Sequence, residues 1–395
     1  MSKGHIFLAS PHMSAEGYEK EFIQEAFDTN WIAPLGKNVN EFENEICRKL
    51  GVKKAVAVSA GTAAIHLGLK TLGIKRGDYV FCQSLTFSAS ANPITYEGGI
   101  PVFIDSETDS WNMSPTALEK AFEGHKKNNT MPKAVIVVHL YGTPAKIDEI
   151  REICNRYNTP IIEDAAESLG SKYKGRYTGT FGNIGIISFN GNKIITSSGG
   201  GMVLFNGENA EAEAKKAVFW ATQARDAARH YQHSEIGYNY RMSNIVAGIG
   251  RGQLRVLDKR VEQKKAIYEY YKKEFASLDG LKMMPLPDYA DCNCWLSVLS
   301  LSDDCKVRPL DIMLALEEVD AESRPVWKPL HLQPVFKDCE FYSDVDDLKV
   351  IDEDTGADNS ISGRLFHNGV CIPSDTKMDE EDLERVSRAI KNLWK

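Results

Sequence analysis

Short apolar runs alternate with longer amphipathic stretches through the first half of the chain. Continuous apolar runs of this length are typical of strands buried on both faces. They fall at residues 55–58, 79–82, 101–104, 134–138 and 160–162. The stretches around and between them repeat apolar positions at helical spacing, at residues 18–27, 39–50, 62–72, 86–96, 115–122 and 146–157. This alternation predicts a mostly parallel sheet with helices on both faces, a three-layer α/β/α arrangement.

The pattern becomes richer in helix after two further strands. Apolar runs at residues 184–189 and 201–205 follow each other closely and predict those strands. A helix-rich stretch then covers residues 210–275, with a break at 237–242. Its later part, residues 245–275, predicts one long helix that connects two domains.

Beyond residue 278 the pattern changes again. A strand at residues 295–301 and helices at 310–319 and 379–394 predict a smaller α+β unit. We therefore predict a large domain over residues 1–250 and a smaller C-terminal domain over residues 251–395, entered through the long helix. The Asp-rich residues 344–359 predict a solvent loop.

Composition and charge narrow the class of protein. The chain has 395 residues, of which 26% are charged, and a formal net charge of −8. Nucleic-acid binding needs clustered Lys and Arg, so this balance argues against it. No run approaches the roughly 20 apolar residues that cross a bilayer, and the first residues do not resemble a signal peptide. We expect a cytoplasmic protein with no nucleic-acid or membrane partner.

The eight cysteines are scattered along the chain. In a long chain without a secretion signal, this usage predicts reduced thiols. The close pair Cys292 and Cys294 lacks the spacing and the nearby Cys or His partner of a zinc site. We therefore predict no metal site.

An acid and a lysine follow two of the predicted strands. The run at 160–162 continues through Glu163 to Asp164, and Glu167 follows three residues later; Lys193 comes just past the run at 184–189. An acid at the end of a buried strand is costly unless it has a partner. Such a carboxylate suits the ring nitrogen of pyridoxal phosphate (PLP), whose aldehyde forms a Schiff base with a lysine. The alternatives are that Asp164 caps a helix and that Lys193 is a surface lysine.

A turn of small residues follows the first predicted strand. Ser59 and Ala60 lead into Gly61 and Thr62, which open a helix. Small residues let backbone N–H groups approach an anion, and the helix N-terminus favours negative charge by ~0.3–1 kcal/mol. We read this turn as a phosphate cradle; the alternative is a plain strand–helix turn with a Ser or Thr cap.

Three further segments carry candidate binding groups. Phe87 follows the strand at 79–82, where an aromatic ring can stack on a flat cofactor or belong to the core. The segment 324–331 sets basic and aromatic groups among prolines, which suits an anionic ligand that contains a ring, or a surface loop. The polar segment 237–244 precedes a helix, and it is either part of the site or a turn with a Ser243 cap.

Taken in order, these segments resemble the nucleotide-sugar aminotransferases, the DegT-type branch of fold-type-I PLP enzymes. The resemblance runs from the helix at residue 18 to the last helix. It rests on Gly61-Thr62-Ala63-Ala64, Thr86-Phe87, Glu163-Asp164-Ala165-Ala166, Ser188-Phe189, Lys193 and Asn239-Tyr240-Arg241. It implies the fold-type-I PLP-dependent transferase fold.

The resemblance also implies roles for single residues. Lys193 is the catalytic residue and forms the Schiff base with PLP. Asp164 holds the pyridine nitrogen, Phe87 stacks on the ring, and Glu167 lies near the phenolic oxygen.

The phosphate of the cofactor is implied to lie in the cradle. Gly61, Thr62 and Ser188 bind it within one subunit. Asn239 reaches the phosphate of the neighbouring subunit's cofactor, which implies a homodimer whose active sites form across the interface.

Two departures from the common family pattern point to one subgroup. The chain has Ser198-Gly199-Gly200-Gly201 where the family often has Gly-Glu-Gly-Gly, and Glu167 where it often has His or Gln. Both departures look like the enzymes that aminate UDP-linked 4-keto-6-deoxy-N-acetylhexosamines in bacillosamine-type pathways. The segments 190–193 and 327–331 look like that subgroup too.

We therefore expect transamination of a UDP-linked 4-keto-6-deoxy sugar, with glutamate as amino donor, for surface glycan or glycoprotein sugar synthesis. Arg229, Lys328 and His331 are candidates for the sugar diphosphate on charge alone. The rivals are 3-amination or dehydration by another PLP enzyme, or a non-catalytic regulator with the PLP fold. Relatives with His in place of the lysine act as dehydratases, and the Lys here favours transamination.

Overall fold

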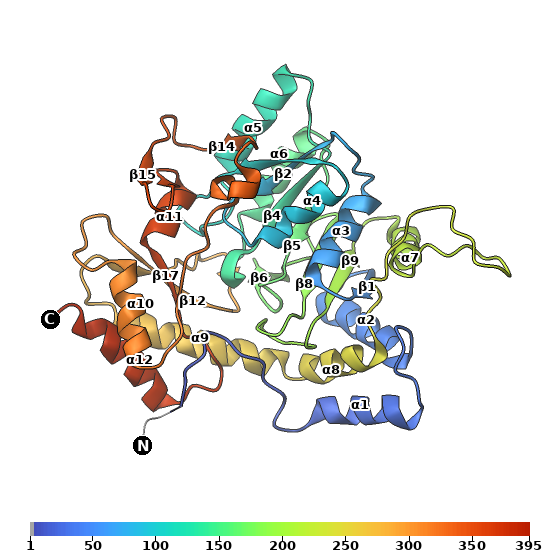
Figure 1. The fold of residues 1–395 in the computed structure, drawn as a ribbon, viewed down its shortest axis with the longest axis horizontal. Helices are drawn as coiled ribbons and strands as arrows, with labels where there is room; N and C mark the ends of the chain where they lie inside the picture. The colour runs from blue at the N-terminus through green and yellow to red at the C-terminus, as the bar shows by residue number, and fades with distance from the viewer. Residues whose placement is uncertain (1–3) are drawn as a thin grey trace.

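The computed structural model describes residues 4–395 and is organised around two main β-sheets (Figure 1). The larger sheet has eight strands in the order β1-β9-β8-β5-β4-β2-β3-β14. Their bounds are β1 Lys54–Val58, β2 Tyr79–Gln83, β3 Ile100–Ile104, β4 Ala134–Val138, β5 Ile161–Asp164, β8 Ile184–Ser188, β9 Gly201–Phe205 and β14 Phe341–Tyr342.

Seven of the eight strands run in the same direction. The pairs from β8 through β5, β4, β2 and β3 to β14 are all parallel, whereas β9 is antiparallel to both of its neighbours, β8 and β1. Every residue of β4 and β8 is buried, as the unbroken apolar runs predict. The predicted mostly parallel sheet is confirmed. Edge strand β14, which pairs with β3 through Phe341 and Phe103, was not predicted.

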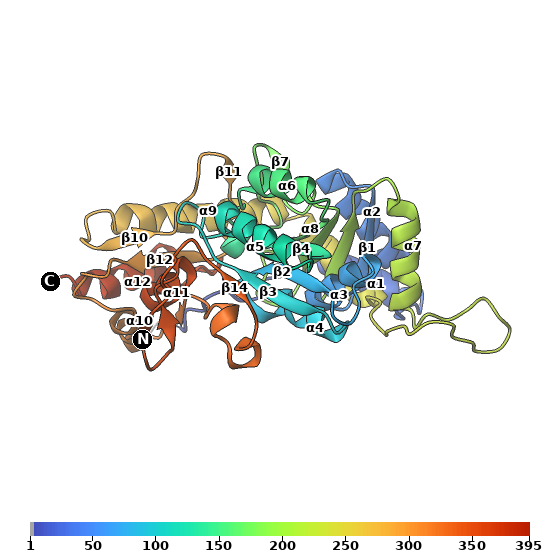
Figure 2. The same ribbon diagram turned by 90° about the horizontal axis from the view of Figure 1, so that it is seen from above.

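Helices cover both faces of this sheet and complete the predicted three layers (Figure 2). One face carries α3 (Gly61–Thr71), α4 (Asn92–Tyr96) and α7 (Ala210–Ala221), whose apolar residues share one core with the strands. The other face carries α2 (Lys37–Leu50) and α8 (Asn244–Leu254) at one end, and α5 (Pro115–Lys127) and α6 (Ile147–Arg156) at the other. Helix α1 (Tyr18–Asp28) lies along α8.

The second sheet is antiparallel and has the order β10-β12-β17-β13. Its strands are β10 Leu281–Met283, β12 Ser297–Leu301, β13 Arg324–Pro325 and β17 Gly369–Ile372. Helices α9 (Leu257–Glu274), α10 (Pro309–Glu318) and α12 (Glu380–Asn392) pack against it, and α11 (Ile361–Asn368) leads into β17. This is the smaller α+β unit that the sequence predicts, and the boundary that we propose near residue 250 lies within α8.

The predicted single helix over residues 245–275 is wrong in one respect. The helix breaks at Arg255 and Val256, which separate α8 from α9. Leu257, at the start of α9, still packs in the core under the large sheet, whereas Ile267 and Tyr271 belong to the core of the small sheet. The break therefore lies where the helical segment passes from one core to the other.

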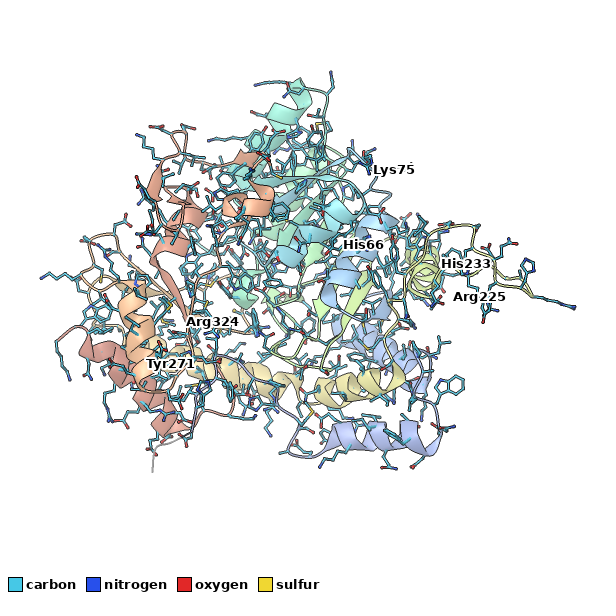
Figure 3. All side chains as sticks on the ribbon, viewed as in Figure 1. His66, Lys75, Arg225, His233, Tyr271 and Arg324 are labelled. Atoms are coloured by element: carbon cyan, nitrogen blue, oxygen red, sulfur yellow. The ribbon has the colours of Figure 1, made fainter. Side chains whose placement is uncertain are left out.

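The predicted helix-rich character of residues 222–236 is also wrong. Helix α7 ends at Ala221, and Gln223 and Ala224 adopt left-handed backbone conformations, with φ of 69° and 50°, that a helix cannot contain. The chain then projects from the body as a long arm, residues 225–236, on which Figure 3 labels Arg225 and His233. Tyr231 and Ile236 are more than three-quarters exposed on this arm (78% and 77%), so it has no core to pack against within the chain.

The structure also differs from the sequence predictions in several short helices and strands. The helix predicted at 86–96 begins later, as a 3₁₀ turn (Ser88–Ser90) followed by α4, because Thr86 and Phe87 precede it in a loop. The predicted solvent loop at 344–359 contains a hairpin, β15 (Val350–Asp352) and β16 (Ala357–Asp358), and ends in the buried Asp358. A three-stranded sheet was not predicted; it consists of β6 (Lys172–Tyr173), β7 (Arg176–Tyr177) and β11 (Ala290–Asp291).

The sequence predicts neither a membrane-spanning segment nor a metal site. Over residues 4–395, no helix combines the length and apolar character that crossing a bilayer requires. In the same range, no three His, Cys, Asp or Glu side chains are grouped as ligands of a metal ion.

Candidate active site

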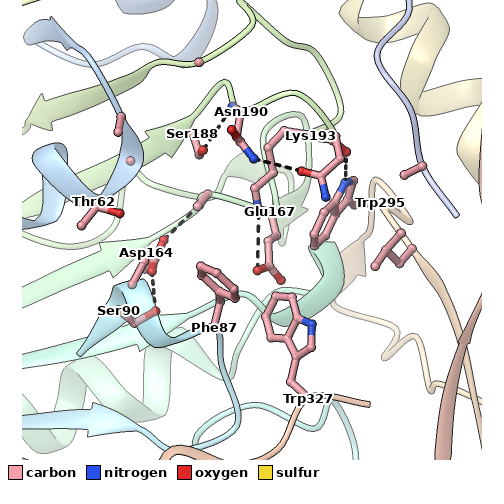
Figure 4. A pocket seen from close by; sticks show the side chains of 18 of the residues that line it. Thr62, Phe87, Ser90, Asp164, Glu167, Ser188, Asn190, Lys193, Trp295 and Trp327 are labelled. Atoms are coloured by element: carbon pink, nitrogen blue, oxygen red, sulfur yellow. Dashed lines mark hydrogen bonds and ion pairs between the residues drawn. The ribbon is translucent and has the colours of Figure 1, made fainter. Parts of the chain in front are cut away.

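A cavity of about 580 Å³ opens between the large sheet and the small one (Figure 4). The turns after β1, β5 and β8 line it on one side, so it lies at the carboxyl ends of parallel strands, where open α/β sheets bind ligands. The small sheet and the loop before β12 line the other side. Its walls include Gly61, Thr62, Phe87, Ser90, Asp164, Glu167, Ser188, Asn190, Lys193, Trp295, Arg324, Trp327 and Cys371.

The start of α3 forms one end of the cavity. Strand β1 ends at Val58, and α3 begins at Gly61, so the free N–H groups of the first helical turn lie at the cavity wall beside Ser188. A Cβ on Gly61 would lie 3.1 Å from the Cβ of Ser188 and 3.3 Å from its Oγ. Gly61 therefore keeps open the space between two groups that can donate hydrogen bonds to an anion.

We expect Gly61→Ala to weaken binding of PLP to the cofactor-free protein about tenfold. The added methyl group would crowd Ser188, which β8 holds in place, and would narrow the space for a phosphate. Titration of the cofactor-free protein with PLP, followed by protein fluorescence, measures the effect. Gly207→Ala is the matched control, since the nearest atom to its new Cβ lies 4.0 Å away. Equal affinities for the two variants would contradict the prediction.

Asp164 is held at the end of β5 with both carboxylate oxygens engaged. Ser90 Oγ donates to Oδ2 at 2.7 Å, and the Ala166 N–H donates to Oδ1 at 3.1 Å. Burial raises the pKa of Asp164, while these hydrogen bonds and the charge of Lys193 oppose the rise. The side chain is buried beside the cavity, and no ion pair formed within residues 4–395 includes it.

The neighbouring acid, Glu163, points to the opposite face of the sheet, because successive side chains of a strand alternate. Its Oε1 accepts hydrogen bonds from His139 Nε2 at 2.7 Å and from the Gly179 N–H at 2.6 Å. Its Oε2 accepts from the N–H groups of Phe181 and Gly182 at 2.8 and 2.9 Å. Glu163 therefore anchors the loop between β7 and β8, and Asp164 is the acid that faces the cavity.

Lys193 lies on the turn after β8, between a carboxylate and an aromatic ring. Its Nζ is 3.7 Å from Glu167 Oε1 and 4.0 Å from the centroid of the Trp295 ring. Only 12% of its side chain is exposed. Burial lowers the pKa of Lys193, whereas the charges of Glu167 and Asp164 oppose that change. A buried lysine of this kind more readily provides the neutral amine that acts as nucleophile or base.

Glu167 accepts a hydrogen bond at Oε2 from the Tyr141 N–H at 2.7 Å. Burial raises the pKa of Glu167 to about 7, against the opposing charge of Lys193. Tyr141 itself has a left-handed backbone (φ 52°), and its hydroxyl accepts a hydrogen bond from the Trp327 N–H at 3.1 Å. The carboxyl group of Glu167 is thus fixed at the junction of the two sheets.

We expect Glu167→Gln to remove a pH dependence of stability. A carboxyl group whose pKa rises from 4.5 to about 7 on folding keeps its proton in the folded state while the unfolded chain releases it. The free energy of unfolding therefore falls as pH rises through this window, by about 3 kcal/mol. Glutamine does not titrate, so the variant gains stability relative to the natural chain between pH 5 and pH 8.

Urea unfolding of the cofactor-free protein at several pH values measures this difference. Glu123→Gln is the control, because Glu123 is exposed on α5 and its substitution should leave the pH dependence unchanged. Parallel stability curves for the natural chain and Glu167→Gln would contradict the prediction.

The structure brings seven of the predicted cofactor residues to this cavity. They are Gly61, Thr62, Phe87, Asp164, Glu167, Ser188 and Lys193. The Phe87 ring lies on a loop, is 58% exposed, and has its centroid 5.7 Å from that of Trp327. It therefore belongs to the cavity wall and not to the core.

The remaining predicted residues lie outside this cavity. Asn239 is exposed on the strand-like segment after the arm, where it bridges to Thr222, and Arg229 is exposed on the arm itself. Lys328 Nζ donates to the Thr355 carbonyl at 2.5 Å. His331 hydrogen-bonds Ser84 at 2.7 Å and Asp358 at 3.0 Å. Their roles toward a substrate stay predictions.

Two residues of the site were not identified from the sequence. Ser90 falls inside the predicted helix 86–96, although the hydroxyl-rich segment Thr86-Phe87-Ser88-Ala89-Ser90 after a strand was a usable signal. Trp295 was assigned only to a strand, yet it lines the cavity, and its Nε1 donates to the Asn192 carbonyl at 2.7 Å. No local pattern could show that contact, because it joins segments about a hundred residues apart.

Comparisons with known proteins agree over almost the whole chain. A family model described as the DegT/DnrJ/EryC1/StrS aminotransferase family matches residues 14–391. EpsN of Bacillus subtilis (strain 168), provisionally described as a pyridoxal phosphate-dependent aminotransferase, is 54% identical over 389 residues, which cover 98% of this chain and 96% of EpsN. GDP-perosamine synthase of Escherichia coli O157:H7 is 35% identical over 381 residues, covering 96% of this chain and 97% of that enzyme. The crystal structure of a DegT DnrJ EryC1 StrS aminotransferase from Brucella abortus matches with a TM-score of 0.84 at 27% identity, covering 96% of each chain.

Proposed function

Because the chain belongs to the DegT/DnrJ/EryC1/StrS aminotransferase family, we propose that it aminates the 4-keto carbon of a nucleotide-linked 6-deoxy sugar. Membership makes it a PLP-dependent sugar aminotransferase. Within that class, we assign UDP-2-acetamido-2,6-dideoxy-4-keto-hexose as the acceptor and glutamate as the amino donor. The observation that supports this proposal is a single cavity that holds a buried acid, Asp164, and a buried lysine, Lys193.

The cavity walls fit the cofactor group by group. Asp164 is a buried carboxylate without an ion-pair partner in residues 4–395, which suits a protonated ring nitrogen. The Phe87 ring offers a face for a flat ring, and Glu167 offers a carboxyl group for the ring oxygen. The phosphate fits the start of α3, where Gly61 leaves room beside Ser188. When bound, PLP supplies an electron sink that acidifies the carbon carrying the amino group.

Lys193 carries the proton in each half of the reaction. When PLP is bound, the Lys193 amine would hold it and would be released by the amino donor; the free amine would then take a proton from the donor Cα and pass it to the cofactor, as general base and acid. In the second half, Lys193 would move a proton in the opposite sense, from the cofactor to the sugar carbon that receives nitrogen. Burial favours the neutral amine, which acts as base, whereas the charges of Glu167 and Asp164 favour the ammonium, which acts as acid.

The carboxylates of the amino donor and the diphosphate of the sugar need cationic partners. Among the described residues that line the cavity, Arg324 is a cationic side chain besides Lys193. Arg324 lines the wall formed by the small sheet, and its side chain is 62% exposed. The one ion pair that it forms within residues 4–395 is a contact of 4.0 Å with Glu322. We assign Arg324 to a carboxylate of the donor or to the sugar diphosphate. Arg229, Lys328 and His331 remain candidates for the diphosphate.

We also propose that two copies of the chain share their active sites. Asn239 and Arg229 lie outside the chain's own cavity, on or beside the arm that projects from the body (Figure 2). Exposed apolar side chains on the arm, Tyr231 and Ile236, suit burial against a second copy. In a two-fold dimer, each arm would serve the site of its partner.

Subunit mixing tests this arrangement. We expect Lys193→Ala and Asn239→Ala homodimers to be inactive, and a refolded equimolar mixture to recover about a quarter of the natural activity. Half of the dimers are then hybrids, and each hybrid has one site with both native residues. Recovery of no activity from a mixture shown to contain hybrids would contradict a shared site.

A substrate panel tests the reaction itself. The purified protein is given glutamate and UDP-, GDP- or dTDP-linked 4-keto-6-deoxy sugars, and mass spectrometry follows the replacement of the carbonyl oxygen by an amino group. We expect the UDP-linked N-acetylated sugar to react fastest. One relative is named a GDP-perosamine synthase. If the GDP-linked sugar reacts fastest, the assigned nucleotide changes from UDP to GDP.

The same panel, extended with the corresponding 3-keto sugars and with reactions lacking glutamate, distinguishes the rival reactions. Amination of a 3-keto sugar alone would replace 4-amination, and loss of water without glutamate would indicate dehydration. Glutamate-dependent bleaching of the cofactor absorbance is expected, and it would exclude a non-catalytic regulator.

A further inference from the structure

Trp295 caps the reactive lysine from the side of the small sheet. Its ring centroid is 4.0 Å from Lys193 Nζ, and the residue is 2% exposed. Its Nε1 donates to the carbonyl of Asn192, the residue before the lysine, at 2.7 Å. One side chain thus contacts both the ammonium of Lys193 and the peptide that carries it (Figure 4).

A second buried lysine holds the backbone of Trp295. Lys264, on α9, donates from Nζ to the Trp295 carbonyl at 2.9 Å and to the Ser374 carbonyl at 2.5 Å. These carbonyls lie just before β12 and just after β17, so the ammonium joins the ends of two neighbouring strands of the small sheet. A small cavity of about 10 Å³ is lined by both Lys193 and Lys264, which places Lys264 behind the reactive lysine.

Lys264 lies in surroundings that do not favour an ammonium. The residue is 5% exposed, and no ion pair within residues 4–395 includes it. The titratable groups that act on it are Asp375 and Cys294, which raise its pKa, and Arg260, which lowers it. Burial is the largest influence and lowers the pKa of Lys264 to about 8.

Asp375 is itself engaged by other donors. Its Oδ1 hydrogen-bonds His12 Nε2 at 2.5 Å, and its Oδ2 accepts from the Ser10 N–H at 2.6 Å. Burying a cation against carbonyl groups costs more than filling the same space with an apolar side chain. A stability role alone therefore does not explain a lysine at this position.

We propose that Lys264 is a positioning residue for Lys193: it holds the Trp295 carbonyl and thereby keeps the indole face against the Lys193 ammonium. The contact of an aromatic face with a desolvated ammonium favours the charged form of the amine. Glu167 and Asp164 are the other groups that favour that form. Lys264 thus sets, through Trp295, how readily Lys193 gives up and takes back its proton. The inference rests on the proposed role of Lys193.

The experiment uses the cofactor-free protein and does not depend on turnover. PLP is added, the adduct is reduced with borohydride, and mass spectrometry quantifies the modified Lys193 peptide against pH. The rate rises with pH through the pKa of Lys193, since the neutral amine is the nucleophile. We expect Lys264→Met to move the midpoint to lower pH by on the order of half to one unit, because the ammonium loses its aromatic contact.

The direction of the shift separates two mechanisms. Removing a nearby like charge, with Trp295 unmoved, would raise the midpoint instead of lowering it. Trp295→Leu should lower the midpoint at least as far as Lys264→Met does. The double variant should match Trp295→Leu alone, because the two residues act in one chain of contacts.

Lys265→Met is the matched control. Lys265 is the next residue of α9, is 39% exposed, and pairs with Asp291 at the surface, so its loss should leave the midpoint unchanged. Where Lys264→Met fails to fold, Lys264→Leu takes its place in the same series, because leucine also lacks a donor for the Trp295 carbonyl, and the same downward shift is expected.

Three outcomes would overturn the inference. They are an unmoved midpoint in Lys264→Met, a raised midpoint, and a double variant whose shift is the sum of the single shifts. Absence of any Lys193 adduct in the natural chain would instead overturn the proposed function, and this inference with it.

Discussion

Lys193→Ala is expected to lower kcat for sugar amination by about 10⁴-fold. Within residues 4–395, Lys193 is the one amine that both lines the cavity and lies beside the buried acids Glu167 and Asp164. Without it, no side chain in the cavity can both bind the cofactor covalently and move the proton to and from carbon. We expect alanine to leave the fold intact, since the Lys193 ammonium contacts side chains of the cavity wall, Glu167 at 3.7 Å and the Trp295 ring at 4.0 Å.

Product formation followed by mass spectrometry measures this loss. Lys75→Ala is the control, because Lys75, which Figure 3 labels, is exposed on the turn before β2 and does not line the cavity. The control should retain full activity. A Lys193→Ala protein that keeps more than about a tenth of the natural kcat would show that the lysine is not the proton carrier.

Asp164→Asn is expected to lower kcat/KM by about 10²–10³-fold. The amide has nearly the same shape as the carboxylate. Its oxygen can still accept from the Ala166 N–H, and its NH2 group can donate to Ser90 Oγ, which then accepts instead of donating. The amide lacks the negative charge that a protonated ring nitrogen requires. Removing one preorganised electrostatic partner from a buried site typically costs this much. The free energy of unfolding should not fall, because burial already disfavours the charge of Asp164 in the cofactor-free protein.

Kinetics and urea unfolding, measured on the same preparations, separate the two effects. Ser90→Ala is the graded control: it removes the hydroxyl that donates to Asp164 Oδ2 at 2.7 Å but leaves the charge. We expect it to cost about tenfold in kcat/KM, roughly the value of one hydrogen bond to a charged group. A loss in Asp164→Asn no larger than that in Ser90→Ala would contradict a role for the charge.

The order of strands and helices in the first half could be predicted because their patterns are local. Residues 134–138 are all apolar, without the alternation of apolar and polar residues that marks a strand with one solvent-exposed face. In the structure this strand is buried on both faces, as that pattern predicts. The segment after α7 could not be predicted in this way. Its mixture of Ala, Arg and His is compatible with a helix. Only the structure shows that the backbone turns left-handed at Gln223 and Ala224, where α7 has ended and the projecting arm begins.

For the candidate site, the sequence indicated the residues that belong to short motifs at strand ends. Asp164 and Lys193 follow strands that are neighbours in the sheet, so their proximity follows from topology once the strands are correctly ordered. Ser90, Trp295 and Lys264 belong to no such motif. Each contributes through a contact with a residue distant in the sequence, such as the bond from Ser90 to Asp164.

The sequence by itself determined the parallel α/β sheet, the carboxyl ends at which chemistry takes place, and the candidate acid and lysine. The reason is that each of these features has a local sequence signal. Short stretches of neighbouring residues indicate strands buried on both faces, the starts of helices and the ends of strands. Only the tertiary structure showed what Glu163 does: it is adjacent to Asp164 in sequence but points to the opposite face of the sheet, where it anchors the loop between β7 and β8. It also decided that Trp295 and Lys264 support Lys193, because the packing of the small sheet against the large one brings these segments together.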